Sequence, residues 1–287
     1  MHVRVKSNAM LIQLLSDLHL EVDPTFIPTP APNANVLVLA GDIGGQGRGD
    51  GKGSKLGRDD PYGLLRFSPT LSRWPTPVLY VPGNHEYDGA DLDTTRIALS
   101  EECTRLGITW LDRESVVMGS VRFLGATLWT DFDALSQWPD HMPGAMTRNM
   151  KMREVCFRAA TYHLKAAATT RFGVPFDASA VADLSREHQA WLRANLASPF
   201  AGKTVVITHF APSLKSADPR FGITPGTAGF CSHLDDLVAH ADVWMHGHLH
   251  CRSDYLLNGC RVISNPLGYA KKGEQLGFDG ERVIEVG

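Results

Sequence analysis

The chain has 287 residues, of which 43% are hydrophobic, and it carries a formal net charge of −3 with an isoelectric point near 6.4. This apolar content can bury a large core, and α/β chains of this length often fold as one domain. The mild negative charge, without a basic stripe of interleaved aromatic residues, disfavours a nucleic-acid partner.

The apolar segments and the cysteines indicate a cytoplasmic protein. No run of 18 apolar residues is present to cross a membrane, and the apolar stretch at 10–15 is too short for the core of a signal peptide. The five cysteines are scattered and form no C-x-x-C pair, which is typical of reduced thiols. Residues 1–9 include Ser7-Asn8-Ala9, which resembles a cloning remnant, so we expect a tag or a disordered leader there.

Five short apolar runs along the chain are each followed by a small polar cluster. We expect the runs to be buried strands, in the order 11–15, 36–40, 78–81, 204–207 and 243–245. The clusters after them contain, in the same order, Asp17 and His19, Asp42, Asn84 and His85, His209, and His248 and His250. Because open α/β sheets place their chemistry just beyond the strand ends, the five clusters are predicted to converge.

The residue types in these clusters indicate a metal site. Carboxylate, imidazole and carboxamide groups suit borderline divalent ions such as manganese, iron, cobalt, nickel and zinc, and no cluster offers a pair of thiolates. Two such ions, about 3.5–4 Å apart, can clamp an in-line displacement at phosphorus when one acidic ligand bridges them. Asp42 stands alone in its cluster and is therefore the predicted bridge.

Taken together, the five blocks resemble the calcineurin-like metallophosphoesterase family, whose pattern is D-x-H, G-D, G-N-H-[DE], a strand-end His and G-H-x-H. Asn265-Pro266-Leu267-Gly268-Tyr269 is a softer match after the last block. Carried over residue by residue, the resemblance implies one metal held by Asp17, His19 and His250 and another held by Asn84, His209 and His248, with Asp42 shared by both. His85 matches the family's histidine that contacts the phosphoryl group without binding a metal.

The resemblance also implies the fold, a four-layer α/β/β/α sandwich in which two mixed sheets are flanked by helices. Residues 10–287 would form this single metallophosphoesterase domain. A strand at 121–128 and a helix at 93–106 agree with it. Two stretches look like insertions, a Gly-rich loop at 44–60 and a partly helical segment at about 131–183.

The Gly-rich stretch directly follows Asp42. Seven of the fourteen residues from 44 to 57 are Gly, and Arg48, Lys52 and Lys55 lie between them. We interpret it as a surface loop, with a substrate lid whose cations meet phosphate as the alternative. It lacks the V-D-R-G sequence that follows G-D in protein Ser/Thr phosphatases, which disfavours a phosphoprotein substrate.

The second insertion has helical composition at 151–170. Trp138, Met142 and Met146 crowd its first half, and such residues at helical spacing favour a core or subunit interface, with a specificity cap as the alternative. Arg148 is the cation that we predict to contact the substrate phosphate.

Four further polar residues lie close to these motifs. His246 alternates with His248 and His250, a pattern that could suggest a three-histidine metal site. Such sites usually have a carboxylate soon after the histidines, and none follows here, so we interpret His246 as a structural or supporting residue. His188 lies in an amphipathic helical stretch and is predicted to be packed or exposed rather than catalytic. Glu21 and Glu86 are predicted to be hydrogen-bonding supports.

The predicted activity is hydrolysis of a small phosphodiester or phosphomonoester by direct attack of a hydroxide that bridges two metal ions, with manganese the expected ion and iron, zinc, cobalt and nickel the alternatives. His85 would stabilise the transferring group and protonate the leaving oxygen. Alternatives are a nuclease of the same superfamily, a phosphoprotein phosphatase and a catalytically silent metal-binding scaffold. The only protein partner that we consider is a second copy of the same chain, in a homo-oligomer.

Overall fold

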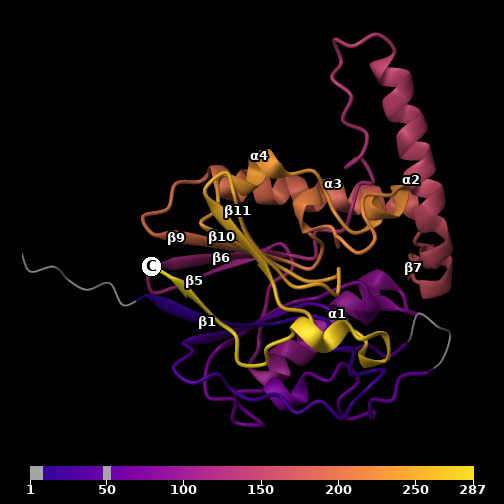
Figure 1. Ribbon diagram of the computed structural model, residues 1–287. Coiled ribbons are helices and arrows are strands. Elements are labelled where there is room, and N and C mark those ends of the chain that lie inside the picture. Colours follow the sequence, from indigo (N-terminus) through magenta and orange to yellow (C-terminus); the bar gives the residue numbers. More distant parts are fainter. Residues whose placement is uncertain (1–8, 48–52) are drawn as a thin grey trace, which may run out of the picture.

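The computed structural model describes residues 9–47 and 53–287, and two β-sheets lie face to face at its centre (Figure 1). The first sheet has its strands in the order β13-β1-β2-β3-β4. These are Val283–Val286, Met10–Leu15, Val36–Ala40, Val78–Val81 and Thr109–Trp110. The strands β1 to β4 pair in parallel, whereas β13 pairs with β1 antiparallel.

The second sheet has its strands in the order β11-β12-β10-β9-β6-β5. These are Ser253–Leu257, Cys260–Ser264, Val243–His246, Lys203–Thr208, Val121–Ala126 and Glu114–Met118. The four inner strands are parallel and both edge strands are antiparallel. Both sheets are therefore mixed, as the predicted fold requires.

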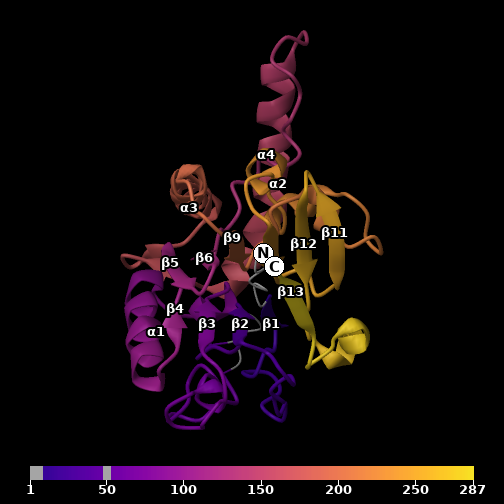
Figure 2. The same cartoon turned by 90° about the vertical axis from the view of Figure 1, so that its left-hand side faces the viewer.

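The alternation of side chains along each strand builds two cores. Val205 and Ile207 on β9 point between the sheets, where they meet Ile12 of β1, whereas Val206 points to the outer face. The outer faces are covered by helices, α1 (Leu92–Leu106) on the first sheet and α3 (Ala178–Ala197) with α4 (Asp235–Val238) on the second (Figure 2). The predicted four-layer sandwich is confirmed.

The predicted strands and the first helix agree with the structure to within about two residues. The largest difference is at β6, which ends at Ala126 where we predicted 128. Leu128 and Trp129 have φ values of 76° and 50°, a left-handed conformation that leaves the strand ladder. The N–H of Leu128 donates to His188 Nδ1 at 3.1 Å.

The two predicted insertions differ in structure. The described part of 44–60 contains no helix or strand, and Arg48 and Lys52 lie outside the described residues. The segment 131–183 contains the helix α2 (Ala145–Ala167) and a small hairpin of β7 (Thr170–Arg171) and β8 (Val174–Pro175). The helix α2 begins six residues before the predicted 151, and much of it stands out from the body as an arm (Figure 1).

Short 3-10 helices connect these elements. They are η1 (Leu65–Phe67), η2 (His85–Tyr87), η3 (Leu214–Ser216), η4 (Pro225–Gly229), η5 (Ala270–Lys272) and η6 (Glu274–Gly277). Among the described residues, no helix is long and apolar enough to span a bilayer.

Candidate metal centre

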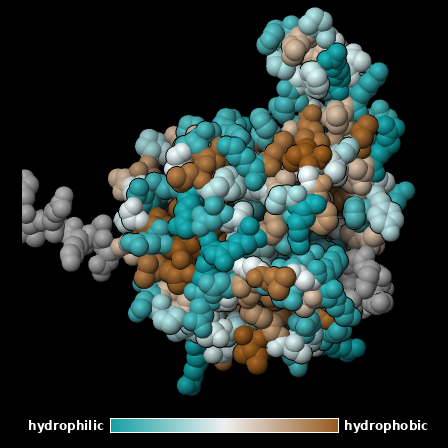
Figure 3. Space-filling model, viewed as in Figure 1, coloured by the Kyte–Doolittle hydropathy of each residue, from teal (hydrophilic) through white to brown (hydrophobic). Residues whose placement is uncertain are grey.

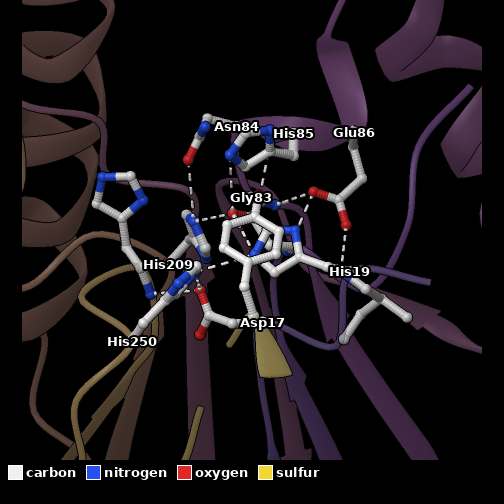
Figure 4. Close-up of polar contacts among 12 residues, drawn as sticks. Asp17, His19, Gly83, Asn84, His85, Glu86, His209 and His250 are labelled. Atoms are coloured by element: carbon white, nitrogen blue, oxygen red, sulfur yellow. Dashed lines mark hydrogen bonds and ion pairs between the residues drawn. The ribbon is translucent and has the colours of Figure 1, made fainter. Parts of the chain in front are cut away.

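The five predicted clusters meet where strands of the two sheets end side by side. Strands β1, β2 and β3 of the first sheet and β9 and β10 of the second run parallel within their sheets and deliver their carboxyl ends to one place. Figure 4 shows Asp17, His19, Asn84 and His85, which follow strands of the first sheet, gathered with His209 and His250, which follow strands of the second. The predicted convergence is confirmed.

One group of ligand atoms comes from Asp17, His19, Asp42 and His250, and these atoms all lie within 4.8 Å of one another. His19 Nε2 lies 2.9 Å from His250 Nε2, and His250 Nε2 lies 3.5 Å from Asp17 Oδ1. Two ring nitrogens and a carboxylate that face one another this closely form a set that a cation would fill.

A second group comes from Asp42, His209 and His248. His209 Nε2 lies 3.2 Å from Asp42 Oδ2 and 3.1 Å from Asn84 Oδ1, so the carboxamide of Asn84 points to the same place. Asp42 belongs to both groups, which is the position that a bridging residue would need.

The charges of the two buried aspartates fit divalent ions. Asp17 and Asp42 are buried, and in the described structure Asp17 Oδ2 has no hydrogen-bond partner, whereas Asp42 Oδ2 faces only imidazole nitrogens such as His209 Nε2 at 3.2 Å. Burial raises the pKa of Asp17, but His250 outweighs it and lowers that pKa to about 2, so the carboxylate is ionised. Because an ionised carboxylate oxygen without a partner is costly to bury, bound cations would stabilise this arrangement.

The backbone around the candidate ligands is strained. Positive φ values occur at five of the seven, namely Asp17, His19, Asp42, His248 and His250, with values between 48° and 71°. Non-glycine residues rarely adopt this conformation, and it costs on the order of 1–3 kcal/mol each where it persists. Strain gathered at one site indicates that the fold holds these side chains for a function.

Three imidazoles are oriented from behind by acceptors. His19 Nδ1 lies 3.0 Å from Glu21 Oε1, His250 Nδ1 lies 2.7 Å from Glu274 Oε2, and His209 Nδ1 lies 2.9 Å from the carbonyl oxygen of Ala40. Each of these oxygens accepts a hydrogen bond from Nδ1–H, which leaves the lone pair of Nε2 directed into the centre. Glu21 is therefore the hydrogen-bonding support that we predicted.

Glu86 supports the centre through the backbone. Its carboxylate accepts hydrogen bonds from the N–H groups of Asp42 at 3.1 Å, Ile43 at 2.8 Å and Gly83 at 2.8 Å. These contacts tie the end of β2 to the turn after β3. The predicted supporting role of Glu86 is thus visible in its contacts.

His85 lies at the open side of the centre. Its side chain is 25% exposed, whereas that of Asp42 is fully buried, and its Nε2 lies 4.0 Å from Asp42 Oδ2. Its Nδ1 lies 2.6 Å from Asp88 Oδ2. Burial lowers the pKa of His85, but Asp42 and Asp88 outweigh that effect and raise it well above its usual value. A protonated imidazole whose Nε2 faces the metal ligands can donate a hydrogen bond to an anion bound there.

Comparison of the chain with known proteins identifies its family. Residues 9–252 match the model of the calcineurin-like phosphoesterase family. This chain belongs to that family.

Two relatives extend over nearly the whole chain. An uncharacterized protein of Acanthamoeba polyphaga mimivirus is 21% identical over 303 residues, which cover 96% of each chain. The crystal structure of phosphopantetheinyl hydrolase from Mycobacterium tuberculosis is similar with a TM-score of 0.65 at 19% identity, covering 97% of this chain and 96% of that one. At this identity the second likeness shows a shared fold.

Sequence reasoning missed three residues of this calcineurin-like phosphoesterase. Asp88 lies three positions after His85 in the same short turn, a spacing that could have revealed it. Glu274 is 24 residues from His250 and gives no local signal. Tyr269 stacks on His19 with ring centroids 4.3 Å apart and meets His250 edge-on at 5.0 Å, although only its loose motif was noted in the sequence.

Three other singled-out residues lie outside the two groups. His246 is buried, with its Nε2 2.9 Å from Ser216 Oγ, and His188 is buried against Leu128, so both are packed residues. The structure does not bring Arg148 to the centre. Its guanidinium lies 4.7 Å above the ring of Trp138, and it is exposed at the start of α2.

Proposed function

We propose that this protein is a dinuclear metal-dependent phosphoesterase that hydrolyses a small phosphodiester or phosphomonoester. The observation that carries the proposal is the pair of ligand groups that share Asp42. Asp17, His19 and His250 would hold one ion, and Asn84, His209 and His248 would hold the other. Manganese is the ion we expect first, with iron, zinc, cobalt and nickel as alternatives, because the donors are nitrogen and oxygen without thiolates.

Bound ions would supply Lewis acidity at phosphorus and a water of lowered pKa as nucleophile. Two divalent ions carry four positive charges, and Asp17 and Asp42 are the two ionised ligands. The surplus of positive charge would attract a phosphate ester and stabilise the negative charge that grows on its oxygens in the transition state. The other ligands are neutral, so they position the ions without cancelling this charge.

His85 would act on the substrate and not on the ions. Its Nε2 faces the centre from the exposed side, and Asp88 fixes the ring by accepting from Nδ1. A protonated His85 can therefore donate to a phosphoryl oxygen and then to the leaving oxygen. Such proton transfer contributes about 10²- to 10⁴-fold to the rate.

The substrate class follows from the site and from the molecule's charge. A structural relative named as a phosphopantetheinyl hydrolase is consistent with a phosphate ester of a small molecule. A nuclease is disfavoured by the net charge of −3, and a phosphoprotein phosphatase by the absence of V-D-R-G after Asp42. A catalytically silent scaffold is disfavoured because the chain has every expected ligand and His85.

The test is hydrolysis of bis-aryl and mono-aryl phosphate esters with added manganese. We expect turnover that disappears with exhaustive chelation and returns with manganese. The ratio of the two activities would assign the diester or monoester preference. Activity that survives chelation would exclude the proposed chemistry.

A further inference from the structure

The segment 265–274 follows β12 and returns to the metal centre. It contains η5 and the first residue of η6, and it lies beyond the residues 9–252 that match the family model. The two short helices, drawn in yellow, lie on the near side of the molecule in Figure 1. On that side the body is covered by hydrophilic side chains with smaller groups of hydrophobic ones between them (Figure 3). The segment is therefore a surface element beside the centre that the family match does not include.

The backbone of this segment is tied to the residues that lead into the first ligand group. The N–H of Leu267 donates to the carbonyl oxygen of Ser16 at 3.1 Å. The N–H of Gly268 donates to the carbonyl oxygen of Asp17 at 2.9 Å. Because Asp17 and His19 belong to the first group, these bonds fix the segment relative to the ligands on that side of the centre.

The ring of Tyr269 packs on two imidazoles of the first group. It stacks on His19 with centroids 4.3 Å apart and an interplanar angle of 26°, and it meets His250 edge-on at 5.0 Å. Lys272 Nζ lies 4.7 Å from the centroid of the same ring. A ligand holds its geometry when packing locks its rotamer, so Tyr269 restricts the rotation of both imidazoles.

One carboxylate oxygen joins the segment to His250. Glu274 Oε2 accepts a hydrogen bond from the N–H of Tyr269 at 2.8 Å and lies 2.7 Å from His250 Nδ1. The approach is close, because a Cβ atom on Gly268 would lie 2.7 Å from Glu274 Cβ and the φ of Gly268 is 67°. The same oxygen therefore fixes the ring of His250 and the backbone that carries Tyr269.

The second ligand group is held by other parts of the chain. His248 packs on Phe210 with centroids 4.1 Å apart and on Phe230 at 5.0 Å. Within the described residues, no hydrogen bond or aromatic contact joins 265–274 to His248 or His209. The supports of the two groups are thus separate.

We propose that the segment 265–274 is a clamp for the first metal site alone, with Tyr269 and Glu274 as positioning residues for His19 and His250. The inference rests on the proposed dinuclear centre and adds the residues that set the affinity of one of its two sites. Loss of such a support typically costs about 10- to 100-fold in metal affinity. Removing the ring of Tyr269 should therefore weaken one ion and leave the other bound as before.

The experiment titrates the metal-free full-length protein with Mn²⁺ in a calorimeter. We expect two ions on the parent, and on Tyr269→Ala one ion of unchanged affinity and one weakened by about 10- to 100-fold. Two backgrounds identify the weakened site. Asn84→Ala keeps the first site, so adding Tyr269→Ala should weaken its remaining ion. His250→Ala keeps the second site, so adding Tyr269→Ala should change nothing.

A conservative variant and a matched control separate positioning from general loss of stability. Tyr269→Phe keeps the ring and should bind both ions as the parent does. Phe278→Ala removes a half-buried ring that packs on Phe26, with centroids 5.8 Å apart, and should also keep both ions. Circular dichroism checks the fold of every variant.

The outcomes distinguish this inference from the proposed function. Equal affinity of both ions in Tyr269→Ala and the parent would overturn the clamp and leave the dinuclear centre standing. A loss in the His250→Ala background, a loss in Tyr269→Phe, or an equal loss in Phe278→Ala would each overturn it as well. A parent that binds fewer than two ions would overturn the proposed function and the clamp with it.

Discussion

At the scale of single residues, Asp42 is the side chain that contacts the most parts of the centre. Its carboxylate belongs to both ligand groups, and its Oδ1 also accepts the N–H of His85 at 2.9 Å. We predict that Asp42→Asn reduces metal content below two ions per chain and damages activity more than any other single ligand change, because it weakens both sites and removes one negative charge. Elemental analysis of the purified variant measures this.

The comparison for this prediction is Asn84→Ala, which touches only the second group. That variant should keep one tightly bound ion. If Asp42→Asn retained two ions with unchanged affinity, the bridging assignment would be wrong.

A change at His85 should affect catalysis without affecting metal binding. We predict that His85→Ala keeps both ions and lowers kcat by about 10²-fold or more, because the side chain acts on the transition state. The loss should shrink for esters with good leaving groups, which depart without a proton. Steady-state kinetics on a series of aryl esters, together with metal analysis, tests both statements.

Two results would contradict this role. Full activity of His85→Ala on a poor leaving group would show that no proton transfer by His85 is needed. Loss of an ion would show that His85 is a ligand.

His188 gives a pH-dependent prediction that is independent of the metals. It is 1% exposed, and burial lowers its pKa from 6.5 to about 4. Below pH 6.5 the unfolded chain binds a proton at this residue and the folded chain does not, so stability falls as pH decreases from 6.5 to 4. We predict that His188→Gln reduces this fall by about 3 kcal/mol over that window.

Urea unfolding at a series of pH values measures the effect. The parent and the variant should show parallel pH dependence above pH 6.5, where His188 is neutral in both states. Identical curves for the two proteins down to pH 4 would mean that His188 is protonated in the folded state.

At the scale of elements, the turn between β3 and η2 controls how closely the two sheets approach at the centre. A Cβ atom on Gly83 would lie 2.2 Å from Asp42 Oδ1 and 2.8 Å from His209 Cε1. Because backbone and ligands leave no room, we predict that Gly83→Ala displaces Asp42 and weakens binding of both ions by at least about tenfold. Metal titration followed by calorimetry tests this.

Gly57→Ala is the matched control, since a Cβ atom there meets nothing within 4 Å. It should bind metal as the parent does. Equal affinity of the Gly83 variant would show that the turn moves away without affecting Asp42.

The arm is anchored at its base to the element that carries His85. Thr169 Oγ1 donates to the carbonyl oxygen of Tyr87 at 3.0 Å, and the N–H of Gly89 donates to that of Ala167 at 2.8 Å. The C-terminal end of α2 therefore returns to the body beside the element that carries His85, whereas the N-terminal half of α2 stands away from the body (Figure 1). Because Trp138, Met142 and Met146 are exposed, they are not part of the core, and the interface and the specificity cap both stay predictions for 131–183. The structure gives no support to Arg148 as a phosphate contact.

At the scale of the whole molecule, the centre joins the two sheets, so metal ions should stabilise the fold. The ligands come from both sheets, and ions that bind the folded state alone raise its stability by mass action. We predict that exhaustive chelation lowers Tm and that manganese restores it. Asp42→Asn should respond less to both treatments, and an unchanged Tm after complete metal removal would contradict the prediction.

The sequence by itself determined the strands, their polar ends and the order of the candidate ligands. Local patterns suffice for this because a buried strand such as 36–40 needs a continuous apolar run, and Asp42 follows it directly in the chain. The resemblance supplied the two-sheet sandwich and the division of the ligands, which periodicity alone could not give. The family match and the structure agree with the fold.

Only the tertiary structure decided the contacts between segments far apart in the chain. Glu274 orients His250 because a loop after β12 returns to the centre, and no local spacing encodes that return. The mildly acidic composition of the whole chain likewise hides the basic character of helix α2. Only the tertiary structure shows that the body covers few of its side chains. Distances in space depend on packing, whereas the sequence pattern reports the burial and spacing of neighbours along one element.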